Sequence, residues 1–433
     1  MSMYNLISFA GIFLLIGFGW LLSTNRRVFN WRVVLWGVGL QIVFALFIFR
    51  VPAGSRFFLL INDLVVKVVE ASSEGARFVF GPLAIPPGVS GSHGFILAFQ
   101  GLPTIIFFSA LISVLYFLNI MPMLIRFFSG IFSRLMRISG AESLCVASNI
   151  FVGVESAFTV RPYIAEMTRS ELCTMLTAGM ATVASNVLAL YVFTLQQSFP
   201  TIAGHLISAS ILSAPAAIVM SKVLYPEEQH PRTLGISVKP DYEKEANVFE
   251  AVINGANAGV KVIAGVAALL IAVLGLVALI DMILNGAGGA VNSFLEINID
   301  WSLKGLLGYL FYPFTLVMGV PLQDATVISQ IVGERVVATE VAGYQDLANA
   351  ISGNLISEPR SVIIATYALC GFAHVASMAI FVGGVSALAP SRTRALSQIG
   401  FRALLAATLA CMVTACVAGV FFTGNSILLG SVE

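Results

Sequence analysis

Residues 148–157, which read Ser-Asn-Ile-Phe-Val-Gly-Val-Glu-Ser-Ala, place a carboxylate, an amide and a glycine among apolar residues. They belong to a chain of 433 residues, of which 58% are hydrophobic and only 10% charged. Soluble domains have a charged fraction of about 25%, so this composition predicts a polytopic membrane protein. An uncompensated charge at membrane depth is costly, so Glu155 is a candidate functional residue.

A second sequence feature is an internal repeat. Gly179-Met-Ala-Thr-Val-Ala-Ser185 recurs as Gly371-Phe-Ala-His-Val-Ala-Ser377, with five of seven positions identical. Each copy follows a segment that contains a glutamate, Glu155 in the first and Glu340 in the second. Secondary transporters are commonly built from repeats whose interrupted helices bind substrate and ion near the midplane. Close packing of small residues is the structural alternative for the two glycines, but the paired glutamates favour a transporter.

Apolar runs without charges predict the membrane crossings, at about 20 residues for each crossing. The basic residues Arg26, Arg27 and Arg32 follow the first run instead of preceding it, which predicts a retained first span with its N-terminus outside. Two amphipathic segments, 56–74 and 123–138, predict interfacial helices. The eight expected spans lie at 1–25, 33–49, 95–118, two within 172–221, 262–280, 361–382 and 403–422.

Two polar segments, 141–169 and 323–354, are poor candidates for full crossings. The first is interrupted by Gly153 and Pro162. We expect both to form re-entrant helical hairpins, because non-helical backbone at membrane depth is tolerated where it lines a cavity. The segment 225–248 is rich in charges and contains three prolines, which predicts a solvated linker between two halves.

These features predict an all-α polytopic membrane protein with about eight transmembrane helices, two re-entrant hairpins, interfacial helices and an internal inverted repeat. Five parts are expected along the chain: N-terminal spans and interfacial helices that are mostly scaffold (1–140), a first transport repeat (141–224), the solvated linker (225–248), a scaffold span with an interfacial helix (249–320), and a second transport repeat with the last span (321–433).

The net charge, the cysteines and the histidines exclude further classes of function. A net charge of +1 argues against nucleic acid as a partner. The five cysteines lie in apolar runs without CxxC spacing, so they are expected to be small buried hydrophobic residues and not part of a metal finger or disulfide framework. Three histidines are expected to be ordinary loop or interfacial residues: His93, His205 and His230.

The order of these segments resembles the concentrative nucleoside transporter family over nearly the whole chain. The resemblance is carried by Asn149-Ile-Phe-Val-Gly153-Val-Glu155, Val160-Arg161-Pro162, Thr339-Glu340 and 371–377, and by two segments, 305–313 and 317–321, that are similar to the region before the family's second hairpin. It implies a homotrimer of elevator-type protomers in the lipid of the cell inner membrane. Such a protein would take up nucleosides on a sodium or proton gradient and would need no other cofactor.

The resemblance also implies which residues form the site. The substrate-binding residues would be Val154, Glu155, Glu340, Phe372, His374 and Ser377. The sodium ligands would be Asn149, Val152, Thr182 and Val183, each of which can offer a side-chain or backbone oxygen.

Three departures from the family pattern affect that site. The segment 153–157 is one residue shorter than the family's Gly-Gln-Thr-Glu-Ala-Pro, so Val154 stands where a Gln/Thr pair contacts the base. Thr339 stands where Asn is usual, and His374 replaces an Asn that contacts the ribose. We therefore expect altered base recognition. His374 is either the titrating group of a proton-coupled protein or a hydrogen-bonded packing residue.

Other functions compete with this interpretation. A symporter of the same fold could take a different small polar substrate, and a channel would need a continuous polar lining. An intramembrane enzyme is disfavoured, because no Ser/His/Asp, HExxH or paired-aspartate motif lies on the expected spans. The sequence therefore predicts a non-enzymatic, cation-coupled nucleoside symporter whose paired carboxylates accept charge-assisted hydrogen bonds from sugar hydroxyls.

Overall fold

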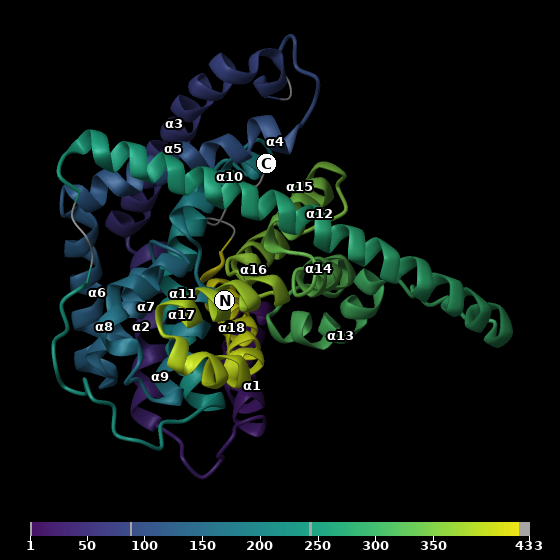
Figure 1. The fold of residues 1–433 in the computed structure, drawn as a ribbon. Coiled ribbons are helices and arrows are strands. Elements are labelled where there is room, and N and C mark those ends of the chain that lie inside the picture. The colour runs from purple at the N-terminus through teal and green to yellow at the C-terminus, as the bar shows by residue number, and fades with distance from the viewer. Residues whose placement is uncertain (1, 87–88, 242–244, 424–433) are drawn as a thin grey trace.

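The computed structural model describes residues 2–86, 89–241 and 245–423, which form α-helices and short 3-10 helices and contain no β-strand (Figure 1). Seven helical segments of the described chain are long and apolar enough to cross a membrane. The remaining predicted span, 361–382, corresponds to two shorter helices in succession, α16 (Pro359–Leu369) and α17 (Val375–Leu388). The predicted all-helical, polytopic fold is confirmed.

The N-terminal part contains the first three predicted spans and both predicted interfacial helices. The amphipathic helix α3 is longer than the predicted segment 56–74, because Pro52 is accommodated in its first turn and no residue before Phe80 interrupts it. The bounds are α1 (Met3–Leu21), α2 (Trp31–Phe49), α3 (Pro52–Phe80), η1 (Gly81–Ala84), α4 (Leu97–Gln100), α5 (Leu102–Phe117) and α6 (Ile120–Met136).

The first repeat consists of a hairpin followed by an interrupted helix and a long helix. One arm of the hairpin is α-helical, and the other begins as a seven-residue 3-10 helix, which is longer than is common for this type of helix. Residues 182–184 separate the halves of the interrupted helix. The bounds are α7 (Gly140–Asn149), η2 (Val154–Val160), α8 (Arg161–Ile164), α9 (Arg169–Ala181), α10 (Ser185–Leu195) and α11 (Ile202–Leu224).

The second repeat has the same order of elements. Its hairpin has two α-helical arms, and residues 370–374 separate α16 from α17. The remaining bounds are α13 (Leu303–Val317), α14 (Leu322–Glu334), α15 (Glu340–Ser352), η3 (Pro390–Arg392) and α18 (Thr393–Phe421). Both predicted hairpins and both predicted helix interruptions are therefore present.

The two interruptions meet at the centre of the molecule. A Cβ atom on Gly371 would lie 2.6 Å from the Met180 carbonyl oxygen and 2.7 Å from the Cys411 sulfur. Only glycine permits this approach of one interrupted helix to the other without displacing backbone. The repeated glycine is thus explained by contact between the two copies.

A buried ion pair in the first repeat joins the C-terminal end of α11 to the N-terminal ends of α7 and α9. Lys222 on α11 lies 2.8 Å from the Glu142 carboxylate on α7 and 3.0 Å from the Ser170 hydroxyl on α9. Thr168 and Glu171 form a capping box at the start of α9. These contacts fix the first hairpin arm against the helices that follow it.

The connection between the repeats is more than a solvated linker. Its charged residues are largely exposed, but its backbone binds the first hairpin at two places. The Thr233 carbonyl accepts a 2.9 Å hydrogen bond from the Gly140 amide, and the Asp241 amide donates one of 2.9 Å to the Thr159 carbonyl. Sequence composition could not reveal these backbone contacts.

The span predicted at 262–280 is part of a much longer helix, α12 (Val248–Leu295), of 48 residues. No proline interrupts it, and at ~1.5 Å per residue it is about 72 Å long. It packs mainly on α5 and projects beyond the other helices (Figure 1). Gly255 and Gly259 make this packing close, since added Cβ atoms would lie 2.6 Å and 2.7 Å from α5 backbone carbons.

The cysteine prediction is confirmed, because all five cysteines are buried free thiols. The prediction for His205 is wrong. This residue lies inside α11 and is fully buried, with Nδ1 3.2 Å from the Tyr367 hydroxyl. A hydrogen-bonding partner on α16 allows this imidazole to occupy the core.

Candidate functional site

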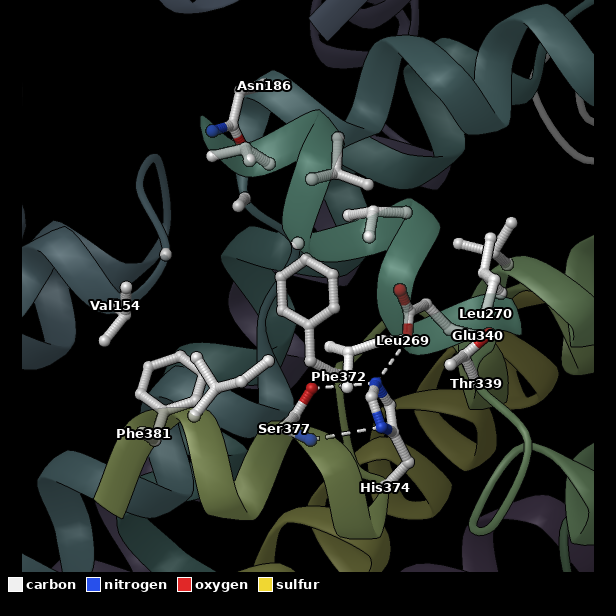
Figure 2. Close-up of a pocket in the computed structure, with 18 of the residues that line it drawn as sticks. Val154, Asn186, Leu269, Leu270, Thr339, Glu340, Phe372, His374, Ser377 and Phe381 are labelled. Carbon is white, nitrogen blue, oxygen red and sulfur yellow. Dashed lines mark hydrogen bonds and ion pairs between the residues drawn. The ribbon is translucent and has the colours of Figure 1, made fainter. Parts of the chain in front are cut away.

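A cavity of about 580 Å³ lies where both repeats face α12. The first hairpin contributes its tip and the second contributes Thr339 and Glu340, while Phe372, His374 and Ser377 come from the second interrupted helix. Residues of α12 from Lys261 to Leu270 form the opposite wall. Figure 2 shows Glu340, His374 and Ser377 close together and Val154 at some distance from them. All six predicted substrate residues line this cavity.

Glu340 is the first residue of α15 and is only 4% exposed. Thr339 caps the helix by accepting a hydrogen bond from the Ala342 amide. A carboxylate at this position is stabilised by the positive end of the helix dipole. Its Oε1 accepts a 2.7 Å hydrogen bond from the Tyr191 hydroxyl, and its Oε2 lies 2.7 Å from His374 Nε2. Glu340 is therefore held in place before any ligand arrives.

His374 is the N-cap residue of α17. The Ser377 amide donates to its Nδ1 at 3.2 Å, so Nδ1 presents a lone pair and the proton of the neutral ring is on Nε2. Nε2 lies 2.7 Å from both Glu340 Oε2 and the Ser377 hydroxyl oxygen. The imidazole thus caps a half-helix with one nitrogen and orients a carboxylate with the other.

Glu155 is the second residue of the second arm of the first hairpin, and its carboxylate interacts with the backbone of Gly153 and of Glu155 itself. It makes no side-chain hydrogen bond or ion pair within the described residues and is exposed to the cavity. Val154 beside it packs toward Gly384 on α17. Glu155 is therefore available to accept hydrogen bonds from a ligand, whereas Val154 offers only an apolar surface.

The four predicted ion ligands lie at the hairpin tip and the first helix interruption. Asn149 is fully buried, donates from Nδ2 to the Cys145 carbonyl at 3.0 Å and accepts at Oδ1 from the Ser156 hydroxyl at 2.8 Å. The Thr182 hydroxyl donates to the Ala178 carbonyl at 2.9 Å. The Ser185 amide donates to the Phe151 carbonyl, which ties the tip to the interruption next to Val152 and Val183. An amide oxygen has two lone pairs, so Asn149 retains one for a cation.

Sequence reasoning missed three residues of this site. Tyr191 binds Glu340 from the other repeat, and Asn186 and Lys261 line the cavity. Lys261 is the only lysine or arginine among the described residues that line it. A lysine within a long apolar helix was a detectable signal, whereas Tyr191 lies in an unremarkable apolar run.

Two hairpin tips and two interrupted helices that enclose a cavity against an outer helix define a secondary membrane transporter built on an inverted repeat. Comparison with known protein families identifies the family of transporters to which the chain belongs. Models described as Na+ dependent nucleoside transporter N-terminus, nucleoside recognition and Na+ dependent nucleoside transporter C-terminus match residues 10–83, 98–198 and 205–419. The chain belongs to the concentrative nucleoside transporter family.

Individual relatives agree with this assignment. An "Uncharacterized transporter" of Haemophilus influenzae is 38% identical over 96% of this chain and 97% of that protein. Solute carrier family 28 member 3 of Mus musculus is 36% identical over 96% of this chain but only 59% of its own length. Sodium/nucleoside cotransporter 1 of Rattus norvegicus is 34% identical, with 98% of this chain and 65% of that protein covered.

The fold also matches solved structures of one transporter in different states. CNTnw in an inward-facing substrate-bound state is 34% identical, with a TM-score of 0.87 over 97% of this chain and 98% of that one. A doubly substituted CNTnw in an outward-facing state is 33% identical, with a TM-score of 0.88 over the same shares. The chain therefore has the fold of an elevator-type, multi-pass plasma-membrane transporter.

Proposed function

We propose that this chain is a symporter that takes up nucleosides together with a cation. The observation that carries this proposal is the cavity in which Glu155 is open to a ligand and Glu340 is held by Tyr191 and His374. Carboxylate oxygens accept charge-assisted hydrogen bonds from vicinal hydroxyls, which suits them to a ribose. Phe372, half-buried at the same cavity, offers a flat apolar surface against the ligand.

Sodium is the proposed coupling ion. The supporting observation is a set of neutral oxygen donors at Asn149, Val152, Thr182 and Val183, a chemistry suited to a hard monovalent cation. Proton coupling is the alternative, and His374 beside Glu340 is the titratable group that would serve it.

Uptake into proteoliposomes that contain the purified full-length protein tests both proposals. We expect radiolabelled uridine or adenosine to accumulate above its external concentration when sodium is high outside. Uptake that only equilibrates would indicate a channel. Accumulation that does not depend on sodium but follows an imposed pH gradient would show that protons are the coupling ion.

We also propose that the chain forms a homotrimer and that each protomer consists of a moving transport unit and a fixed scaffold. Segments 141–224 and 321–433 would move as the transport unit, and segments 1–140 and 249–320 would form the scaffold. The apolar, largely exposed surface of α12 supports this arrangement, because a neighbouring protomer and lipid can both cover it. The mass of the protein in detergent, measured by light scattering, would distinguish a trimer from a monomer.

A second candidate function is a symporter of the same fold for a different small polar substrate. The specific observation that favours it is Val154, whose apolar side chain cannot bind a base edge as a Gln/Thr pair can. A thermal-shift screen against nucleosides, free bases and sugars, with and without sodium, separates the two candidates. Stabilisation by a sugar or base alone, and by no nucleoside, would favour the second.

A further inference from the structure

A second cavity, of about 230 Å³, adjoins the central one at the tip of the first hairpin. Four residues line both cavities: Gly153, Glu155, Asn186 and Val262. The other walls of the second cavity are α5, the second arm of the first hairpin, one turn of α12 and the linker residue Asp241. This cavity therefore lies between the first repeat and the two helices α5 and α12.

The second cavity connects the proposed sodium site with the linker. Val152, one of the four proposed ion ligands, and Asp241 both line it. The Thr24 amide donates a 3.0 Å hydrogen bond to the Leu224 carbonyl, which places the start of the linker beside the loop that contains Arg26. The basic residues of that loop predict a cytoplasmic location. The second cavity thus extends from the proposed sodium site toward the predicted cytoplasmic side.

The charged residues of the second cavity are all acidic. Glu155 and Asp241 line it, whereas no lysine, arginine or histidine does so in the part of the chain that the structure describes. The central cavity, by contrast, is also lined by Lys261 and His374. A cavity lined by one sign of charge between apolar walls raises the local concentration of the opposite ion. The second cavity therefore attracts cations.

Two oxygen atoms in the same lining have no hydrogen-bond partner among the described residues. Ser109 on α5 is only 8% exposed, and both its hydroxyl and the Asn186 amide oxygen are buried and unpaired. Buried polar groups without a protein partner mark a place for a water molecule or an ion. Oxygen atoms of this kind are the ligands that hard cations prefer.

The size of the second cavity separates a cation from a second nucleoside. At about 230 Å³ it has less than half the volume of the central cavity, which is about 580 Å³. It is also smaller than most small-molecule pockets, which have volumes of roughly 300–1,000 Å³. Its volume and its charge together fit a hydrated monovalent cation.

We propose that the second cavity is the route by which the coupling cation leaves the proposed sodium site for the cytoplasm, separate from the cavity that holds the nucleoside. Because Glu155 borders both cavities, one carboxylate links the departure of the cation to that of the nucleoside. This inference rests on the proposed coupling to sodium.

Ala258 on α12 offers a test, because it is exposed and lines the second cavity but not the central one. Ala258→Phe narrows the proposed route, and Ala258→Ser is the matched control that adds little volume. Two fluxes are measured with the full-length protein in proteoliposomes. Net nucleoside uptake into sodium-free vesicles requires release of sodium inside, whereas nucleoside exchange with saturating sodium on both sides does not.

We expect Ala258→Phe to slow net uptake severalfold and to leave the exchange rate and the nucleoside affinity at their wild-type values. Ala258→Ser should resemble the wild type in both fluxes. Equal losses of net uptake and exchange in Ala258→Phe would overturn the inference, because the second cavity would then serve the nucleoside or the movement itself. Unchanged net uptake would overturn it as well.

A cysteine variant tests the charge of the route if Ala258→Phe does not fold. Ala258→Cys is reconstituted and then treated with a cationic or an anionic reagent, aminoethyl or sulfonatoethyl methanethiosulfonate. The native cysteines are buried, and the wild type gives their background. Relative to free cysteine, we expect the cationic reagent to be favoured about 10-fold, and Asp241→Asn to reduce this preference. Equal rates, or no reaction with either reagent, would overturn the inference.

The same flux measurements separate this inference from the proposed function. A wild type whose uptake ignores sodium would refute the proposed sodium coupling and, with it, this inference. A sodium-dependent wild type beside an Ala258→Phe variant without a selective loss of net uptake would refute the exit route alone.

Discussion

The Tyr191 hydroxyl donates a 2.7 Å hydrogen bond to Glu340, and this bond joins the first interrupted helix to the tip of the second hairpin. The phenol ring also packs against Tyr344, with ring centroids 4.6 Å apart and the ring planes tilted by 35°. The position of a carboxylate from one repeat therefore depends on a residue of the other.

Tyr191→Phe should weaken nucleoside binding while leaving the fold intact. A hydrogen bond to a charged group contributes about 1.5–3 kcal/mol, so we expect a loss of roughly 10-fold or more in affinity. Isothermal titration of the purified protein measures this loss. Tyr344→Phe is the matched control, because its hydroxyl donates to the Thr366 carbonyl and not to Glu340. Equal losses of affinity in both variants would contradict a specific role for Tyr191.

Glu155→Gln and Glu340→Gln should each abolish uptake. Each substitution removes the charge from hydrogen bonds worth about 1.5–3 kcal/mol to sugar hydroxyls. Initial uptake rates in proteoliposomes provide the measurement. Glu70→Gln on α3 is exposed and lies outside the cavity, so it should transport normally. Wild-type rates in either cavity variant would remove that glutamate from the site.

The imidazole of His374 should be needed for nucleoside binding. The Ser377 amide donates to its Nδ1, and its Nε2 lies 2.7 Å from Glu340, so loss of the ring leaves both the start of α17 and the carboxylate without this partner. His374→Ala should therefore weaken binding measured by isothermal titration, whereas His374→Asn keeps a capping side chain and should lose less affinity. His93→Ala, at an exposed loop position, should retain wild-type affinity. Equal losses in His374→Ala and His374→Asn would contradict the capping role.

Discrimination between bases should be loose. Val154 presents an apolar wall, and such a wall separates ligands that differ by a methylene by only about 1–3 kcal/mol. Purine and pyrimidine nucleosides should therefore compete for uptake with similar affinity. A hundredfold preference for one base, or a ligand without a ribose-like ring that outcompetes all nucleosides, would show that the cavity has been adapted to a different substrate.

Gly371→Ala should destabilise the centre of the protein. The new methyl group would meet the Met180 carbonyl and the Cys411 sulfur, and overpacking of this kind costs about 1–3 kcal/mol. Thermal unfolding in nanodiscs tests this expectation. Gly39→Ala on α2 is the control, because an added Cβ there meets no atom within 4 Å. Equal unfolding midpoints for Gly371→Ala and Gly39→Ala would mean that the interruption at 370–374 can move away from α9 at little cost in stability.

The sequence predicted the hairpins and the interrupted helices because polar residues, glycines and prolines within apolar runs are local signals. The repeat did not predict where each interruption begins, at Thr182 in one copy and at Cys370 in the other. In the first copy the Thr182 amide still donates to the Ala178 carbonyl, whereas in the second Arg335 binds the carbonyl of Ala368. This difference depends on a side chain 33 residues away from that carbonyl.

The hydrogen bond between Tyr191 and Glu340 could not be predicted either, because it also joins residues that are far apart in the sequence. Tyr191 lies 149 residues before it, and nothing local distinguishes this tyrosine from its apolar neighbours. The length of α12 was underestimated at both ends, because 248–261 and 281–295 are less apolar than the predicted span and yet contain no proline that would end the helix. Predictions based on local pattern therefore located the site but not the contacts that hold its residues in position.

The cavity wall formed by α12 divides the contacts of a ligand into two groups. The polar groups at Glu155, Glu340 and His374 belong to the repeats, whereas Val262, Val266 and Leu269 belong to a helix that packs mainly on α5. If the repeats move past α12 as proposed, a nucleoside keeps its contacts with these polar groups and leaves the apolar ones behind. The polar groups of the repeats would thus determine which molecule is bound. The apolar wall of α12 would determine at which step of the movement the bound molecule loses part of its contacts.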